Sequence, residues 1–172
     1  MKKIRNFTFR SAVPADAGAL RDVTSDDRAT SDYGSPVWVG SDWWEHRIKR
    51  TVNNGLFLVA ECDSQIVGFL ELFVDTSDWM RRHVGVLSLC VHENFRNFGI
   101  GRALMDVGIE QADSYLGLIR IELFVWVSNE PAIRLYESLD FFREGLHVAF
   151  GYRKGNHENA LSMARINKKM IT

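Results

Sequence analysis

The chain has 172 residues, of which 46% are hydrophobic and 25% are charged, and its formal net charge is −1. A chain of this length can bury one substantial core, so we expect residues 1–172 to form a single domain. The balanced charge excludes the basic excess typical of nucleic-acid-binding proteins, and no apolar run is long enough for a membrane span or a signal peptide. We therefore expect a cytoplasmic protein with neither a nucleic-acid nor a membrane partner.

The first half of the sequence predicts four strands and two helices. β-Branched and aromatic runs predict the strands, and helical composition after polar residues predicts the helices. The expected strands are residues 7–11, 56–62, 65–74 and 83–91, and the expected helices are residues 17–28 and 41–52, the second capped by Ser41-Asp42. Because Asp63-Ser64 favours a tight turn and a second turn is expected around Thr76-Ser77-Asp78, the last three of these strands should be antiparallel neighbours.

The two cysteines of the chain, Cys62 and Cys90, both fall inside expected strands. Two such thiols do not make a disulfide scaffold, which agrees with a cytoplasmic protein. Cys90 also raises the question of a nucleophilic thiol that forms a covalent intermediate. A nucleophilic thiol needs a base to activate it, and no histidine is placed for this apart from His92, two residues further along the same strand. We therefore favour a Cys90 thiol that is simply packed in the sheet.

An irregular segment separates the two expected helices. Between Thr24 and Gly40 the pattern is broken by Asp, Ser, Gly and Pro residues, and Tyr33 and Trp38 interrupt this polar run. A long loop that contains aromatic side chains is a candidate substrate-binding segment. The alternative, that both side chains only fasten the loop to the core, stays open.

A strand that runs into a glycine-bearing loop is the most informative feature of the chain. Leu87 to Val91 is apolar, and Arg96-x-x-Gly99-x-Gly101 follows it and opens a helical pattern. Glycines at such a turn expose several backbone N–H groups together, and the helix dipole adds positive potential, so the segment predicts a site for a phosphate-bearing ligand. A plain tight turn also fits two glycines, so the motif alone leaves both interpretations open.

A second strand-to-helix unit lies roughly thirty residues further along the chain. Residues 120–127 are β-branched and aromatic, and Asn129 can cap a helix that has Pro131 in its first turn. Asp140, before Phe141, stands at the left-handed position that ends such a helix, where glycine is the usual residue.

Together the two units resemble the GNAT-type N-acetyltransferases. The resemblance rests on Arg96-x-x-Gly99-x-Gly101, which matches the coenzyme A pyrophosphate loop of that family, and on the helix from Asn129 to Tyr136. It covers almost the full length, because an expected hairpin of residues 142–152 and 157–165 completes the family's order of elements. It implies an α/β (α+β) fold with a twisted, mixed, mostly antiparallel sheet of about seven strands, flanked by about four helices and splayed between strands four and five. Asp140 departs from the family's usual glycine.

The resemblance implies acetyl-coenzyme A as the co-substrate. In the family the pantetheine arm pairs with the fourth strand, and the loop and the following helix hold the pyrophosphate. The residues that the resemblance assigns to the coenzyme are Leu89, Cys90, Val91, Arg96, Asn97, Phe98, Gly99, Ile100, Gly101, Arg102 and Asn129. Arg96 and Arg102 can equally be solvated surface arginines. The five histidines show no metal-ligand spacing, so we expect no metal.

The implied reaction is direct attack of a neutral amine on the thioester carbon. By resemblance Tyr136 takes the place of the acid that protonates the leaving thiolate, although a tyrosine here can also be plain core. Glu71 is the best carboxylate candidate for the base, because it stands among apolar residues of its strand. The alternatives are Ser88 with a water chain and, for Glu71, a solvent-facing charge.

The acceptor is expected to be a small molecule with a primary amine. The tail from Glu144 to Arg165 is similar to a bacterial subgroup that acetylates the α-amine of free amino acids, and the loop with Tyr33 and Trp38 lies where that subgroup covers its acceptor. Aromatic walls suit apolar amino-acid side chains. A protein N-terminal or lysine acetyltransferase, a non-catalytic acetyl-coenzyme A sensor and a homodimer all remain open.

Overall fold

The computed structural model describes residues 6–25, 39–153 and 155–171. Strands and helices follow one another in the order expected from the sequence. The elements are β1 (Phe7–Ser11), α1 (Ala17–Val23), α3 (Ser41–Asn53), β2 (Gly55–Cys62), β3 (Gln65–Phe73), β4 (Val84–Val91), α4 (Ile100–Ser114), β5 (Arg120–Trp126), α5 (Glu130–Glu137), β6 (Phe142–Arg153) and β7 (Asn156–Ile166), with short 3-10 helices at Pro14–Asp16, Glu93–Phe95 and Lys168–Met170. No helix in the described ranges is long and apolar enough to cross a membrane.

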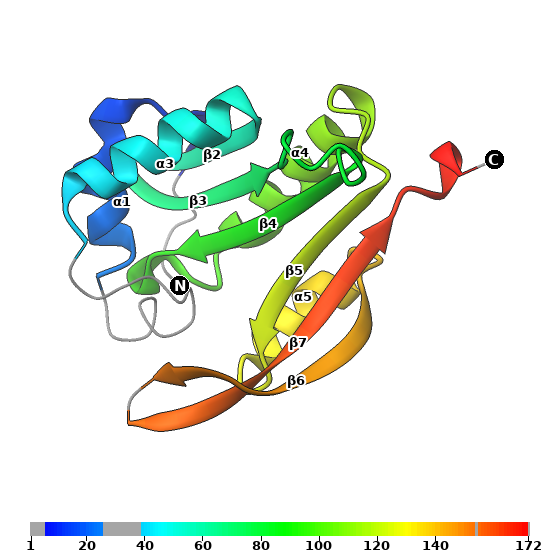
Figure 1. The fold of residues 1–172 in the computed structure, drawn as a ribbon. Coiled ribbons are helices and arrows are strands. Elements are labelled where there is room, and N and C mark those ends of the chain that lie inside the picture. Colours follow the sequence, from blue (N-terminus) through cyan, green and yellow to red (C-terminus); the bar gives the residue numbers. More distant parts are fainter. Residues whose placement is uncertain (1–5, 26–38, 154, 172) are drawn as a thin grey trace.

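All seven strands belong to one twisted sheet with the order β1-β2-β3-β4-β5-β7-β6. Neighbouring strands are antiparallel except β4 and β5, which are parallel. The β4–β5 ladder contains three residue pairs, from Val84–Arg120 to Val86–Glu122. Beyond these pairs the two strands diverge (Figure 1). This confirms the predicted mixed sheet and its splay between strands four and five.

Each face of the sheet has its own core, because residues alternate between the two faces of every strand. On β2, Phe57 and Val59 pack with α1 and α3, whereas Leu58 and Ala60 belong to the core formed with α4 and α5. The core of α4 and α5 extends under β5 and reaches Met163 on β7. The core of α1 and α3 is built on β2, β3 and β4 in the described residues. Figure 1 accordingly shows α1 and α3 beside β2–β4, with the β5–β7 part of the sheet standing apart from them.

Two expected helix ends are wrong by a few residues. The cap of α3 is Gly40, and Ser41 is already the first residue of the helix, with no side-chain capping bond. The first helix ends at Val23 instead of continuing to residue 28, because Thr24 leaves the helical conformation, with φ −99° and ψ 0°, and its hydroxyl donates to the carbonyls of Leu20 and Arg21. Residues 26–28 lie outside the described part of the chain.

The Asp63-Ser64 turn and the end of α5 confirm two local predictions. Asp63 and Ser64 have φ values of 49° and 63°, as a two-residue hairpin between β2 and β3 requires. Asp140 has a φ of 64°, and the N–H of Phe141 donates to the carbonyl of Tyr136, which closes the C-terminal turn of α5. An aspartate therefore holds the left-handed position that glycine takes without steric cost.

We expect Asp140→Gly to raise the free energy of unfolding by about 0.5 kcal/mol. Glycine removes the left-handed strain from the folded state, and this gain slightly exceeds the free energy by which the greater flexibility of glycine stabilises the unfolded state. Asp140→Val should lower it by about 1–2 kcal/mol, since a β-branched residue tolerates this conformation least. Urea denaturation of the three proteins measures both effects. A destabilised Asp140→Gly would show that the aspartate side chain stabilises the turn by itself.

Candidate active site

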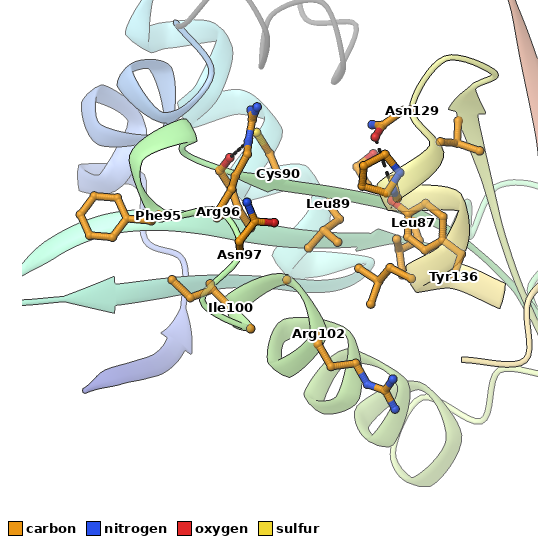
Figure 2. Close-up of a pocket in the computed structure, with 18 of the residues that line it drawn as sticks. Leu87, Leu89, Cys90, Phe95, Arg96, Asn97, Ile100, Arg102, Asn129 and Tyr136 are labelled. Atoms are coloured by element: carbon orange, nitrogen blue, oxygen red, sulfur yellow. Dashed lines mark hydrogen bonds between the residues drawn. The ribbon is translucent and has the colours of Figure 1, made fainter. Parts of the chain in front are cut away.

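A central cleft of about 460 Å³ opens where β4 and β5 diverge (Figure 2). Its volume lies in the range of small-molecule sites. Five segments contribute to it: β4, the loop after β4, the start of α4, β5 and α5. The residues that line it are Leu87, Ser88, Leu89, Cys90, Val91, Phe95, Arg96, Asn97, Gly99, Ile100, Gly101, Arg102, Phe124, Val125, Asn129, Pro131, Ala132, Leu135 and Tyr136.

Strand β4 lines the cleft, and its side chains alternate between the two sides of the sheet. Leu87 and Leu89 belong to the core of α4 and α5, whereas Cys90 packs with the core of α1 and α3 (Figure 2). Along Val86 to Val91 the strand is paired to β3, while its pairing with β5 ends at Val86. The edge of β4 that faces the cleft therefore has backbone groups available for an extended ligand.

Two left-handed residues turn the chain from β4 into α4. Asn97 has a φ of 65° and Gly99 a φ of 82°, and α4 begins directly afterwards at Ile100. The first backbone bond of the helix runs from the N–H of Ala103 to the carbonyl of Gly99 at 3.0 Å. The N–H groups that precede it lie at the positive end of the helix and beside the cleft, as an anion-binding loop requires.

Two arginines line the cleft and are held by neighbouring groups. The Nε of Arg96 donates to the carbonyl of Val91 at 3.0 Å, which fastens the loop to the end of β4. The Nε of Arg102 donates to Asp106 at 3.0 Å, and its Nη1 donates to Ser138 at 3.1 Å. Both guanidinium groups are thus held in restrained positions, and the charge of Arg102 is shared with the Asp106 carboxylate.

The structure brings nearly all of the predicted coenzyme residues together. Ten of them line the cleft: Leu89, Cys90, Val91, Arg96, Asn97, Gly99, Ile100, Gly101, Arg102 and Asn129. Phe98 is the exception, because its ring packs against the core of α4 and α5 instead. The sequence prediction named Phe98 only as part of a continuous loop.

Helix α5 places a buried phenol in the wall of the cleft. The side-chain oxygen of Asn129 accepts from the N–H of Ala132 at 3.4 Å, so Asn129 is the predicted cap of this helix. Tyr136 follows two turns later, is 6% exposed, and lines the cleft. Burial, and to a smaller degree the neighbouring Cys90 thiol, raise the pKa of Tyr136 well above its ordinary value. The phenol therefore keeps its proton.

Glu71 lies in a buried ion pair. Its side chain is 2% exposed, so the solvent-facing interpretation of this residue is wrong. One carboxylate oxygen accepts from Nε of Arg47 at 2.8 Å and also from Nη2 of that residue, and the other accepts from the hydroxyl of Thr51 at 2.6 Å. Glu71 is absent from the lining of the cleft, but it lies opposite Ser88 in the β3–β4 ladder, and Ser88 does line the cleft. A role for Glu71 as base stays a prediction.

Some site residues were not predicted. Phe124, Leu135 and Pro131 line the cleft, and so do Leu87 and Phe95. The alternation of β5 contained a signal for Phe124, because Leu123 and Val125 on either side of it face the core. The two predicted substrate residues, Tyr33 and Trp38, lie outside the described residues.

Cysteine thiols and metal-ligating side chains are further candidates for functional groups in the described residues. Cys62 and Cys90 carry buried thiols on β2 and β4. In residues 6–25, 39–153 and 155–171, no three His, Cys, Asp or Glu side chains gather closely enough to hold a metal ion.

The chain is similar to several known acetyltransferases. It is 38% identical to the L-amino acid N-acetyltransferase AaaT of Escherichia coli (strain K12) over 109 residues, which cover 63% of this chain and 67% of AaaT. It is 32% identical to an N-alpha-acetyltransferase of Sulfurisphaera tokodaii, with 49% of this chain and 55% of that relative covered. The match thus spans about half the length of the second relative.

Solved structures share the fold over almost the whole chain. The ribosomal-protein-alanine N-acetyltransferase of Brucella melitensis superposes with a TM-score of 0.82 at 26% identity, covering 92% of this chain and 99% of that one. The structure of yncA from Salmonella typhimurium, solved with its cofactor acetyl-CoA, gives a TM-score of 0.84 at 22% identity and covers 94% of both chains. The sequence model of the acetyltransferase (GNAT) family matches residues 19–141, well over half of the chain. This protein therefore belongs to the acetyltransferase (GNAT) family.

Proposed function

We propose that this acetyltransferase moves the acetyl group of acetyl-coenzyme A to the primary amine of a small molecule, specifically the α-amine of an apolar L-amino acid. The observation that carries the proposal is the cleft between β4 and β5, which has an anion-binding helix start at one end and the Tyr136 phenol in its wall. The similarity to the L-amino acid N-acetyltransferase AaaT supports the choice of acceptor.

The described residues fit a coenzyme A thioester. The N–H groups from Asn97 to Arg102 suit the pyrophosphate, and the cleft-facing edge of β4 at Leu89 to Val91 suits the amide-bearing pantetheine arm. Arg96 and Arg102 add positive charge for the adenosine phosphates. The acetyl-CoA bound to yncA of the same fold supports this assignment.

The groups in the wall of the cleft suit direct transfer of the acetyl group. The amine nitrogen attacks the thioester carbon, a C–N bond forms, and the C–S bond breaks to release the thiolate. Tyr136 gives its proton to this sulfur, and a backbone N–H of β4 stabilises the oxyanion that develops on the carbonyl oxygen. Because burial raises the pKa of Tyr136, the phenol is protonated throughout the physiological range and carries the proton that the thiolate needs.

The amine must also lose a proton. Glu71 already accepts from Arg47 and Thr51, so its carboxylate is engaged in holding α3 on β3. Ser88, its cross-strand neighbour, lines the cleft and can relay the amine's proton through water to the bulk solvent, which in turn returns a proton to Tyr136 after each turnover. We therefore propose a structural role for Glu71 and a water relay at Ser88.

Protein acetylation is the second candidate function. The relative from Sulfurisphaera tokodaii is an N-alpha-acetyltransferase, and the Brucella melitensis neighbour acts on a ribosomal protein alanine. Release of free coenzyme A in the presence of single amines tests both candidates. We expect apolar free L-amino acids to react at least tenfold faster in kcat/KM than peptides. Faster peptide turnover refutes the small-molecule assignment, and no amine-dependent release with any acceptor indicates a sensor.

Tyr136→Phe keeps the ring packing and removes only the proton donor. We expect acetyl-coenzyme A binding and folding to be unchanged, while the single-turnover rate drops by roughly 10²-fold. The loss should be greatest at high pH, where water supplies protons least readily. An unchanged chemical step, measured by rapid quench so that product release cannot hide it, would remove Tyr136 from the mechanism.

Glu71→Gln separates the structural role from the role of a base. Because the change removes the buried partner of Arg47, we expect the free energy of unfolding to fall by about 3 kcal/mol, while the chemical step of the folded enzyme changes less than threefold. Glu61→Gln is the matched control, since Glu61 pairs with Arg10 in a half-exposed position and should lose less than about 1 kcal/mol. A drop in rate of about 10² or more, with a changed pH profile, would instead identify Glu71 as the base.

A further inference from the structure

Four aromatic side chains form a continuous surface next to the central cleft. We call this surface, made of Phe124, Trp126, His147 and Phe150, the aromatic shelf. Phe124 and Phe150 stack with ring centroids 5.0 Å apart and an angle of 18° between the planes. His147 meets both rings edge-on at 5.2 and 5.8 Å, and Trp126 meets Phe150 at 5.8 Å.

The shelf depends on an irregularity in β6. His147 lies opposite Ala160 of β7 and Gly151 lies opposite Glu158, so three residues of β6 face a single residue, Asn159, of the partner strand. In a regular strand, residues 147 and 150 point to opposite faces. The bulge instead brings both rings to the face of the sheet that carries Phe124. β-Bulges commonly redirect side chains next to functional sites.

Specific contacts hold the bulge. Ala149 has a left-handed φ of 51°, which strains an alanine, and its N–H donates to the side-chain oxygen of Asn159 at 2.8 Å. A Cβ at Gly151 would come within 2.6 Å of the Trp126 ring, so glycine is required where this ring crosses β6. The Nε2 of His147 and the hydroxyl of Ser162 form a hydrogen bond at 3.1 Å. The shelf is thus a built feature with a fixed geometry.

The shelf is exposed although its rings are well stacked. Phe124 is 49% exposed and Phe150 is 45% exposed. On β5 the neighbouring Leu123 and Val125 face the core of α4 and α5, so Phe124 points to the other face, the one on which Cys90 packs with the core of α1 and α3. Large apolar surfaces that remain open on a folded protein commonly bind a ligand or a partner.

The shelf is continuous with the cleft. Phe124 belongs both to the shelf and to the lining of the cleft, together with Ser88 and Cys90 of β4. An amine held where β4 and β5 separate therefore lies beside Phe124, and the group attached to it can extend from Phe124 onto the stacked ring of Phe150. The match to the family's sequence model ends at residue 141, so His147 and Phe150 lie outside the matched part of the chain.

We propose that the aromatic shelf is the subsite for the acceptor's side chain and that it selects aromatic and large apolar side chains over small ones. This inference rests on the proposed function, because it uses an amine acceptor in the cleft. Stacking on Phe124 and Phe150 favours a planar ring over an aliphatic group of equal area. The shelf binds the acceptor without touching the thioester, so its loss should raise KM and leave kcat nearly unchanged.

The test compares L-phenylalanine with L-alanine as acceptors. We expect Phe150→Ala to lower kcat/KM for L-phenylalanine at least tenfold, mainly through KM, and to change kcat/KM for L-alanine less than twofold. Phe150→Leu should give an intermediate loss. Tyr152→Ala is the matched control, because Tyr152 lies on the same strand, is 69% exposed and contacts His157 instead of the shelf. It should leave both acceptors unchanged.

Three results would overturn the assignment. An equal loss for both acceptors would make Phe150 a structural residue, and no loss for either would place the side chain elsewhere. A change in molecular mass by light scattering with unchanged specificity would make the shelf an interface between two copies of the chain. If wild-type protein acetylates only peptides, the proposed function fails. In that case kcat/KM is compared between peptides that begin with Phe and peptides that begin with Ala, for wild type and Phe150→Ala. This comparison decides whether the shelf binds the first side chain of the peptide.

Discussion

The short ladder between β4 and β5 is the constraint on which the rest of the structure depends. Three residue pairs join the two parallel strands, and after Val86 and Glu122 they separate. Strands that part inside a sheet leave backbone N–H and C=O groups without their usual partners, and such groups must be satisfied by water or by a ligand. The sheet tolerates this opening because β4 stays paired to β3, and β5 stays paired to β7, along their other edges.

Two helices begin at this opening and give it its chemistry. α4 starts at Ile100, after the left-handed Gly99, and directs its first N–H groups to one end of the cleft. α5 starts after the Asn129 cap and carries Tyr136 into the wall. A helix start suits an anion, and a buried phenol with a raised pKa keeps the proton that the proposed acid must supply. The groups suited to anion binding and to proton donation thus lie on two helices, on either side of one gap.

In the proposed reaction, the strands beside the gap separate the cofactor from the acceptor. The odd-numbered residues of β4 from Leu87 to Val91 pack with the core of α4 and α5, and Cys90 packs with the core of α1 and α3. On β5 the same alternation directs Phe124 away from the core of α4 and α5. A cofactor that enters beside α4 and an amine that lies on the other face can therefore meet only through the opening. This arrangement restricts the reaction to one place in the sheet.

Local patterns predicted most of the fold and most of the residues that line the cleft on the side of α4 and α5. Hydrophobic runs, the Asp63-Ser64 turn, the Asn129 cap and the left-handed Asp140 depend on short stretches of chain, and the structure contains each of them. Features that join distant segments were not predictable in this way. The ion pair of Glu71 with Arg47 comes from helix packing on β3, and the aromatic shelf depends on a bulge whose residues show no regular alternation. The cap at Gly40 was missed because Ser41 and Asp42 are the more typical capping residues.

Calorimetric titration with acetyl-coenzyme A tests most directly whether the opening between β4 and β5 holds the cofactor. A Cβ at Gly101 would meet only ordinary contacts, at 3.7 Å from Leu89, Val91 and Leu135, so Gly101→Glu should fold while placing a negative charge at the start of α4. We predict that wild-type protein binds and that Gly101→Glu loses at least a hundredfold in affinity. Gly18→Glu, which adds the same charge where nothing lies within 4 Å, should bind like wild type. Undiminished binding to folded Gly101→Glu would contradict the account, because the cofactor would then lie elsewhere.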